Sequence, residues 1–247
     1  QCELLQKLAS GFPGVEYLSA SAAAAELVQP PSPVRGGPYP GIIVAANQVL
    51  YLRLDSFSEP AVEKACADIA GAVRLLRAPV GVVFDLRNAG GEDYAGAVRL
   101  LRLFRANAPR LGSEPEGDQP EQVQLPAIVM VGHETTGAAE VFAALLERGG
   151  NALTMGQPTA GRPFPKRKLR LRRGDLLLVP DVPPPLRSVR SEPVQPAVVA
   201  KSGPQADYEL LAGKVDGDES DLCLQRAVDL LLSLHALHLR SAPSRKE

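Results

Sequence analysis

Two threonines and a histidine stand within four residues of one another, and their side chains are of the types that carry nucleophilic catalysis. Thr135 and Thr136 supply hydroxyl groups, and His133 supplies an imidazole able to act as a base. A threonine hydroxyl becomes a nucleophile only when an adjacent base takes its proton. The competing interpretation is structural, because a threonine near the start of a helix caps its unpaired N–H groups. His133 is equally compatible with an ordinary surface position.

A glycine pair, Gly90-Gly91, follows an apolar run and precedes Glu92 and Asp93. Glycines at such a place suit a tight turn from a strand into a helix, because they adopt dihedral angles that other residues avoid. The two acids then place negative charge at the N-terminus of the next helix, where it is favourable. A catalytic pair of carboxylates is the alternative interpretation.

Charge and cysteine content exclude several classes of function. The 27 basic and 28 acidic residues leave a net charge of −1, which argues against a general nucleic-acid surface. The basic run 166–173 alternates in its second half, which favours a charged, solvated strand face, with an anion or acidic-peptide contact as the alternative. Three scattered cysteines give neither a zinc motif nor a disulfide framework, so we expect no metal and no cofactor.

The spacing of apolar residues predicts the elements that would position these side chains. Residues 1–28 have helical spacing, and a Pro-rich break follows at 29–40. A hairpin is expected from 42–45 and 49–54. Beyond it we predict helices at 60–76, 94–104, 141–146 and 222–239, buried strands at 80–86 and 127–131, a polar loop at 107–124, and an antiparallel pair at 169–171 and 176–179.

The alternation of buried strands and helices predicts an α/β fold with a mostly parallel sheet. In such a sheet, turns after neighbouring strands meet at one edge. Gly90 and Gly137 should therefore lie together at that edge. No signal peptide and no run long enough to span a bilayer is present in the sequence.

Three segments of the sequence, in order, resemble one family, the tail-specific (C-terminal processing) serine proteases. They are residues 51–58, the block Gly81-Val82-Val83-Phe84-Asp85-Leu86-Arg87-Asn88-Ala89-Gly90-Gly91, and residues 126–146. The block is similar to the family's "ILDLRNNPGG", and the third segment to "PLVVLVN…SASASEIVAGAL". Residues 156–162 lie where the family has "GEKTFGKG".

The resemblance implies a ClpP/crotonase-like core of strand–strand–helix units and an extracytoplasmic, for example periplasmic, location. It divides the chain into a helical and Pro-rich segment at 1–40, a core domain at 41–240 and a tail at 241–247. The first segment is too short for the PDZ domain that most members insert. That absence is shared with the repeats of interphotoreceptor retinoid-binding protein, which have a similar core and are not proteases.

The resemblance also implies a site whose catalytic residues are replaced. Gly137 stands at the position of the catalytic serine, Arg162 at that of the lysine base, and Lys166 at that of the glutamine orienting the lysine. Glycine offers no nucleophile, and a guanidinium has no lone pair to accept a proton. Gly90-Gly91 corresponds to the turn whose N–H groups stabilise the oxyanion.

These replacements predict a pseudoprotease that binds a peptide or protein C-terminus, or a small anionic ligand, through Gly90, Gly91, Gly137, Arg162 and Lys166. An active peptidase using Thr135, Thr136 or His133 is the first alternative. A carrier of an apolar ligand is the second, although an aromatic content of 4% disfavours it because apolar ligand sites are commonly lined by aromatic residues.

Overall fold

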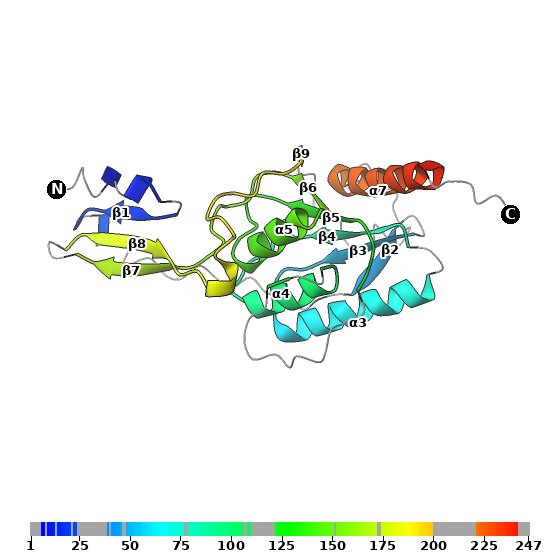
Figure 1. Ribbon diagram of the computed structural model, residues 1–247, viewed down its shortest axis with the longest axis horizontal. Coiled ribbons are helices and arrows are strands. Elements are labelled where there is room, and N and C mark those ends of the chain that lie inside the picture. Colours follow the sequence, from blue (N-terminus) through cyan, green and yellow to red (C-terminus); the bar gives the residue numbers. More distant parts are fainter. Residues whose placement is uncertain are drawn as a thin grey trace.

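Two β-sheets lie one beyond the other along the long axis of the computed structural model (Figure 1). The larger sheet carries the helices that surround the apolar core, and the smaller one extends from its side. The structure describes residues 6–7, 9–12, 14–20, 22–23, 39, 41–45, 48–76, 79–105, 108–109, 122–150, 152–171, 174–199 and 221–241.

The larger sheet confirms the predicted α/β architecture. Its strand order is β2-β3-β4-β5-β6-β9. Strand β2 is antiparallel to β3, as the predicted hairpin requires, and every other neighbouring pair is parallel. The strands are β2 (Ile42–Ala45), β3 (Val49–Arg53), β4 (Gly81–Asp85), β5 (Ala127–Val131), β6 (Ala152–Gly156) and β9 (Val198–Val199).

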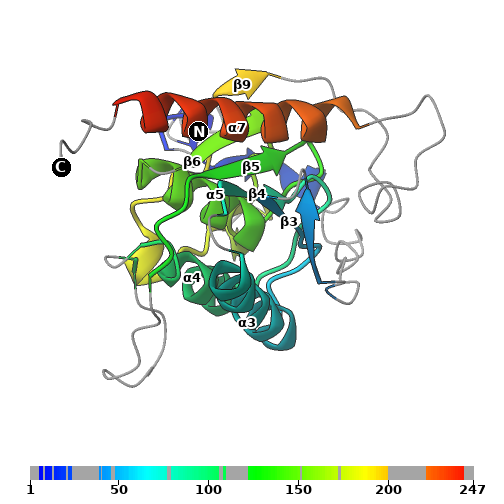
Figure 2. The ribbon, with the colours of Figure 1, turned by 90° about the vertical axis from the view of Figure 1, so that its right-hand side faces the viewer.

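Helices cover both faces of this sheet, which explains why β4 and β5 are apolar on both sides. Helices α3, α4 and α5 pack on one face, and α7 lies across the other (Figure 2). All four were predicted from the sequence. Their bounds are α3 (Glu59–Leu75), α4 (Tyr94–Arg102), α5 (Ala138–Arg148) and α7 (Leu222–Ser241).

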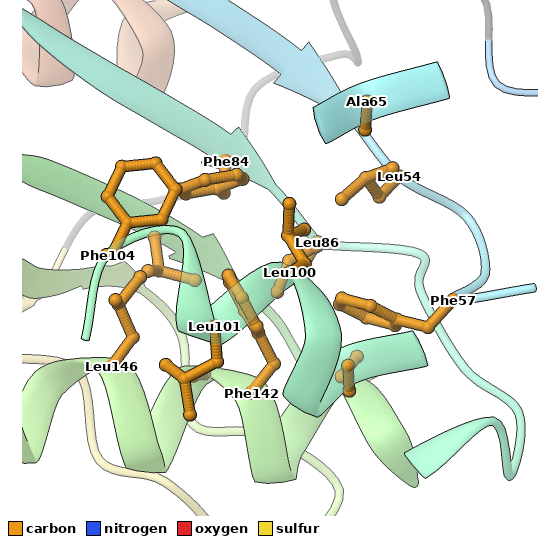
Figure 3. Packing of buried hydrophobic residues seen from close by; sticks show 14 of the residues in the cluster. Leu54, Phe57, Ala65, Phe84, Leu86, Leu100, Leu101, Phe104, Phe142 and Leu146 are labelled. Atoms are coloured by element: carbon orange, nitrogen blue, oxygen red, sulfur yellow. The ribbon is translucent and has the colours of Figure 1, made fainter. Parts of the chain in front are cut away.

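The core beneath α3, α4 and α5 is built around packed aromatic rings (Figure 3). The ring of Phe84, on β4, lies 5.2 Å from that of Phe142 and 5.4 Å from that of Phe104, both nearly edge-on. Phe57 packs on Phe142 from the loop before α3, at 5.2 Å. Edge-to-face packing at these distances is favourable beyond the burial of area alone.

The core beneath α7 is smaller and depends on close approach to the sheet. Helix α7 packs on the side chains of β3, β4 and β5 that point away from α3, α4 and α5. Its contacts come from Cys223, Leu224, Ala227 and Leu231. A Cβ atom at Gly81 would lie 2.7 Å from Cδ2 of Leu231, so a glycine is needed there for the helix to pack this closely. The buried sheet residues of this face include Val49, Tyr51, Val83, Ile128 and Met130.

The smaller sheet corrects one prediction and confirms another. Strands β7 (Lys166–Arg170) and β8 (Leu176–Pro180) form the predicted antiparallel pair, and β1 (Glu16–Leu18) adds to β8. The helical prediction for 1–28 is therefore wrong at 16–18. Glu16, Tyr17 and Leu18 become a strand because β8 offers them an edge, which is tertiary context that local spacing does not contain.

Several predictions concern residues outside the described part of the chain: the break at 29–38, most of the loop at 107–124, the end of the basic run at 172–173, and the tail at 242–247. The division at residues 40 and 241 stays a prediction. In the described ranges, no helix combines the length and the apolar character needed to cross a membrane.

Candidate functional site

Three loops meet at the carboxyl ends of adjacent parallel strands. They follow β4, β5 and β6 and contain residues 86–91, 132–137 and 157–162. A Cβ atom at Gly90 would lie 2.7 Å from Oγ1 of Thr136, so the first two loops touch. The predicted meeting of Gly90 and Gly137 at one edge of the sheet is confirmed, and open α/β sheets gather their sites at this edge.

Backbone hydrogen bonds fasten the three loops together, and we call this arrangement the three-loop junction. Thr136 N–H donates to the carbonyl oxygen of Ala89 (3.0 Å), and Ala138 N–H donates to that of Gly91 (2.9 Å). Gly137 N–H donates to the carbonyl oxygen of Arg162 (3.0 Å). Each loop is thereby held by at least one bond to another.

Gly137 lies at the centre of the junction in a conformation suited to glycine. It precedes α5 with φ 60° and ψ −128°. A Cβ atom there would lie 2.1 Å from the carbonyl oxygen of Gly91, far inside van der Waals contact. A side chain at residue 137 therefore requires the 89–91 loop to move.

Two of the N–H groups around this point donate to backbone carbonyl oxygens. Ala138, the residue after the predicted serine position, donates to Gly91. Gly90 N–H donates to the carbonyl oxygen of Asp55 at 3.1 Å. An oxyanion hole needs donors directed at the reacting oxygen. In this conformation both groups are directed at the protein's own carbonyls.

The Thr135 hydroxyl is buried and makes two hydrogen bonds within the fold. It donates to the carbonyl oxygen of Leu86 (2.8 Å) and accepts the N–H of Gly132 (2.9 Å). The bond to Leu86 ties the loop after β5 to the loop after β4, and the bond from Gly132 closes the turn within the loop after β5. Thr135 therefore stabilises the junction, rather than capping α5 as the structural interpretation of the sequence had it.

Thr136 and His133 do not form a nucleophile–base pair in this conformation. Thr136 is half-buried beside Gly90. The exposed imidazole of His133 lies near two other side chains: its Nδ1 is 3.4 Å from Oε1 of Gln157, and its Nε2 is 3.5 Å from Oε1 of Glu134.

Glu140 holds the third loop from a buried position in the first turn of α5. Its carboxylate accepts the Thr159 hydroxyl, Gly161 N–H (2.7 Å) and Arg162 N–H (2.8 Å). Burial raises the pKa of Glu140, while these donors and the Arg162 charge act in the opposite direction. With its oxygens turned to the loop, Glu140 fixes the backbone from which the Arg162 side chain projects.

The two basic residues predicted for the site have different surroundings. Arg162 is exposed at the rim of the junction. Lys166 begins β7, and its ammonium group pairs with Glu16 of β1 in the smaller sheet. Lys166 thus has an acidic partner on a strand that the sequence did not predict, and the binding of a ligand by Lys166 and Arg162 together stays a prediction.

The comparison with protein-family models decides the relationship of the chain. The model of peptidase family S41 matches residues 48–182, more than half of the 247 residues. The chain belongs to peptidase family S41. This agrees with the resemblance to tail-specific proteases, and the match spans all three loops of the junction.

Solved structures similar to this S41 domain share its fold at low identity. The photosystem II D1 C-terminal processing protease has a TM-score of 0.54 and 20% identity, with 85% of this chain and 53% of that chain covered. A lipoprotein from Streptococcus agalactiae has a TM-score of 0.51 and 16% identity, with 94% and 81% covered. The chain thus spans about half the length of that processing protease.

A buried ionic cluster beneath the junction of the S41 domain was not predicted as a unit. Arg87 bonds both oxygens of Asp85, at 2.9 and 2.7 Å, and reaches Asp221 at 2.5 Å. Tyr51 donates its hydroxyl to Asp85 (2.8 Å). Asp221 also accepts the N–H groups of Cys223 and Leu224, which begin α7. Burial acts to lower the pKa of Arg87, but the carboxylates of Asp85 and Asp221 together outweigh it and raise that pKa above its ordinary value.

Tyr94 is a further rim residue that the sequence did not single out. It begins α4, and its hydroxyl donates to the carbonyl oxygen of Pro163 (2.9 Å) while its ring packs on Phe164 at 5.7 Å. Burial, followed by the charges of Glu92 and Glu140, raises the pKa of Tyr94. A tyrosine directly after Gly-Gly-Glu-Asp was the available signal, but its partner lies 69 residues later.

Proposed function

We propose that this S41 domain has lost peptidase chemistry and binds an anionic group, such as the C-terminal carboxylate of a peptide or protein, at the rim of the three-loop junction. The observation that carries the first part is the position of the Gly91 carbonyl oxygen. It accepts the N–H of Ala138 and occupies the space in which a side chain at Gly137 would begin.

The chemistry of the replaced residues supports the same proposal. Arg162 stands at the predicted position of the base, and a guanidinium remains protonated and offers no lone pair. Loss of one member of an analogous triad lowers kcat roughly a million-fold, equivalent to about 8 kcal/mol of barrier. Two members are replaced in this chain, so covalent catalysis by the family's route has neither its nucleophile nor its base.

An active peptidase is the alternative, and one observation favours it. Thr136 is half-buried at the edge where the loops meet, with its Oγ1 beside Gly90. A threonine becomes a nucleophile when a base lies within hydrogen-bond reach. His133 is close in sequence, and a change in its side-chain torsion angles would be needed to bring it to Thr136.

We expect no turnover of an unstructured peptide or of a protein with a C-terminal tag, measured by mass spectrometry with highly purified protein. The physical reason is the missing nucleophile and base. A serine-reactive phosphonate should likewise leave residues 132–140 unlabelled. Turnover that survives purification and disappears in Thr135→Ala or Thr136→Ala, with the fold of each variant verified by circular dichroism, would instead establish the alternative.

The binding part of the proposal rests on Arg162. Its N–H is held by Glu140, and its carbonyl oxygen accepts the N–H of Gly137, so the backbone is fixed on both sides. The side chain itself is exposed. An arginine whose backbone is held in place can form bidentate, charge-assisted hydrogen bonds to a carboxylate through its guanidinium group.

We expect a peptide with a C-terminal carboxylate to bind more tightly than its amide, by about 10-fold or more, because a charge-assisted hydrogen bond contributes roughly 1.5–3 kcal/mol. Calorimetric titration measures the difference. Arg162→Ala should abolish it, whereas Arg74→Ala, which removes an exposed arginine of α3, should preserve it. Salt should weaken binding of the acid more than of the amide. Equal affinities of acid and amide would reject Arg162 as the recognition group.

A further inference from the structure

Strand β7 lies at an edge of the smaller sheet in the part of the chain that the structure describes. The order β1-β8-β7 gives it a single neighbour among the described strands. Its residues 167–170 are all exposed, and the strand lies on the outer side of the small sheet in Figure 1. An exposed edge presents unpaired backbone donors and acceptors, which are a template for another strand.

The register identifies which residues face outward. Asp181 N–H donates to the carbonyl oxygen of Pro165 (2.8 Å), and Leu171 N–H donates to that of Asp175 (2.9 Å). The two bonds lie just before and just after β7, so the backbone groups of residues 165 and 171 face β8. Because the direction of backbone groups alternates along an antiparallel strand, 167 and 169 also face β8. The N–H and carbonyl groups of 166, 168 and 170 then point toward the open side.

All three of these residues are basic. Lys166, Lys168 and Arg170 lie opposite Pro180, Leu178 and Leu176, so their side chains share one face of the sheet. Glu16 offsets the charge of Lys166. On the other face β7 carries Arg167 and Leu169, the latter 41% exposed. With a net charge of −1 for the whole chain, this edge is a local concentration of positive charge.

We propose that the β7 edge binds an extended acidic segment of a partner protein, which adds to the smaller sheet as a further strand. The outward backbone groups of residues 166, 168 and 170 would supply the hydrogen-bond ladder, and their side chains would select carboxylates on alternate residues of the partner. Cross-strand pairs of opposite charge are favourable, and pairs of like charge are not. The same charges therefore disfavour pairing of β7 with a second copy of itself.

An extended polypeptide fits this edge better than a nucleic acid or a lipid surface does. A row of backbone donors and acceptors spaced two residues apart matches another strand, and a phosphate chain offers no donors to the outward carbonyl groups. This surface uses the backbone groups of β7, where Lys166 pairs with Glu16 of β1, whereas the proposed carboxylate site uses Arg162.

The test uses an eight-residue peptide of alternating aspartate and valine, acetylated and C-terminally amidated so that it cannot use a carboxylate site at Arg162. Fluorescence anisotropy compares it with its lysine–valine counterpart and with two N-methylated versions, one methylated on the aspartate amides and one on the valine amides. We expect the acidic peptide to bind and the basic one not to bind. One of the methylated peptides should lose binding, because only one set of amides faces β7.

Two substitutions at residue 168 distinguish the contribution of the lysine charge from that of the backbone hydrogen bond. Lys168→Gln removes the charge and retains the outward N–H, and should weaken binding about two- to five-fold. Lys168→Pro also removes that N–H without removing a bond to β8, and should weaken binding by a further factor of about 10 or more. Circular dichroism verifies the fold of both variants, and the methylated peptides provide the same test with the protein unaltered.

Several results would overturn the proposal. These are absence of binding, equal binding of both methylated peptides, or equal binding by the Lys168→Gln and Lys168→Pro variants. Tighter binding of single-stranded DNA or of anionic phosphatidylserine vesicles, weakened equally by Lys168→Gln and Lys168→Pro, would indicate a simple charge patch. Arg162→Ala should leave binding of the amidated acidic peptide unchanged, so the outcome is separable from that of the carboxylate titration.

Discussion

Gly137→Ser should not restore peptidase activity, alone or with Arg162→Lys, and should lower the free energy of unfolding by about 2–6 kcal/mol. A backbone held in a region reserved for glycine costs about 1–3 kcal/mol for other residues, and forcing atoms into an occupied space costs about another 1–3 kcal/mol. Both apply, since φ is 60° and the new Cβ would lie 2.1 Å from the Gly91 oxygen. Urea denaturation measures the loss.

Gly150→Ala is the matched control for this prediction. Gly150 also has a positive φ, 81°, but a Cβ atom there would meet nothing within 4 Å. Its substitution carries the conformational penalty alone, about 1–2 kcal/mol. For this comparison residue 137 is also changed to alanine. If Gly137→Ala and Gly150→Ala lower the free energy of unfolding equally, the loop that contains Gly91 moves at little cost and does not block a side chain at residue 137. Hydrolysis by Gly137→Ser/Arg162→Lys would show that only two side chains separate this domain from a peptidase.

Arg87→Met should destabilise the protein by about 3–5 kcal/mol, because it leaves the carboxylates of Asp85 and Asp221 buried without their cation. The side chains of Arg87 and Asp221 are only 6% and 1% exposed, so water cannot replace the lost bonds. Since Asp221 also receives the first N–H groups of α7, hydrogen exchange should accelerate most in that helix.

Arg53→Met is the control for the loss of Arg87. Arg53 pairs with Asp55 at 3.2 Å, but both side chains are about a quarter exposed. Exposed pairs contribute no more than about 1 kcal/mol, so this variant should unfold nearly as the parent does. Similar losses for Arg53→Met and Arg87→Met would indicate that the buried cluster is not what holds α7.

The sheet of this protein was predictable because its signal is local and strong. The run at 127–131 is apolar throughout, the run at 80–86 is apolar except for Asp85, and the glycines after them marked the loops. The edge at which Gly90 and Gly137 meet then followed from parallel strand order. The more specific ClpP/crotonase-type spiral stays a prediction.

The features that the sequence did not reveal depend on partners far along the chain. Glu16 is a strand residue because β8, about 160 positions later, pairs with it, and its carboxylate then pairs with Lys166. Asp221 has no local pattern that points to Arg87. The bond from Ala138 to Gly91 joins two backbones and leaves no trace in residue types, except that residue 137 has to be glycine.

Helix α7 has a consequence for the biosynthesis of this domain. It alone of the described helices covers the second face of the large sheet, where Val49, Tyr51, Val83, Ile128 and Met130 are buried. A ribosome translating the chain makes all of these strand residues well before Leu224 and Leu231. Until the helix emerges, the nascent sheet exposes an apolar face of the kind that chaperones bind and that aggregates. A fragment ending at residue 182, where the family match stops, would lack α7 and would leave this apolar face exposed permanently.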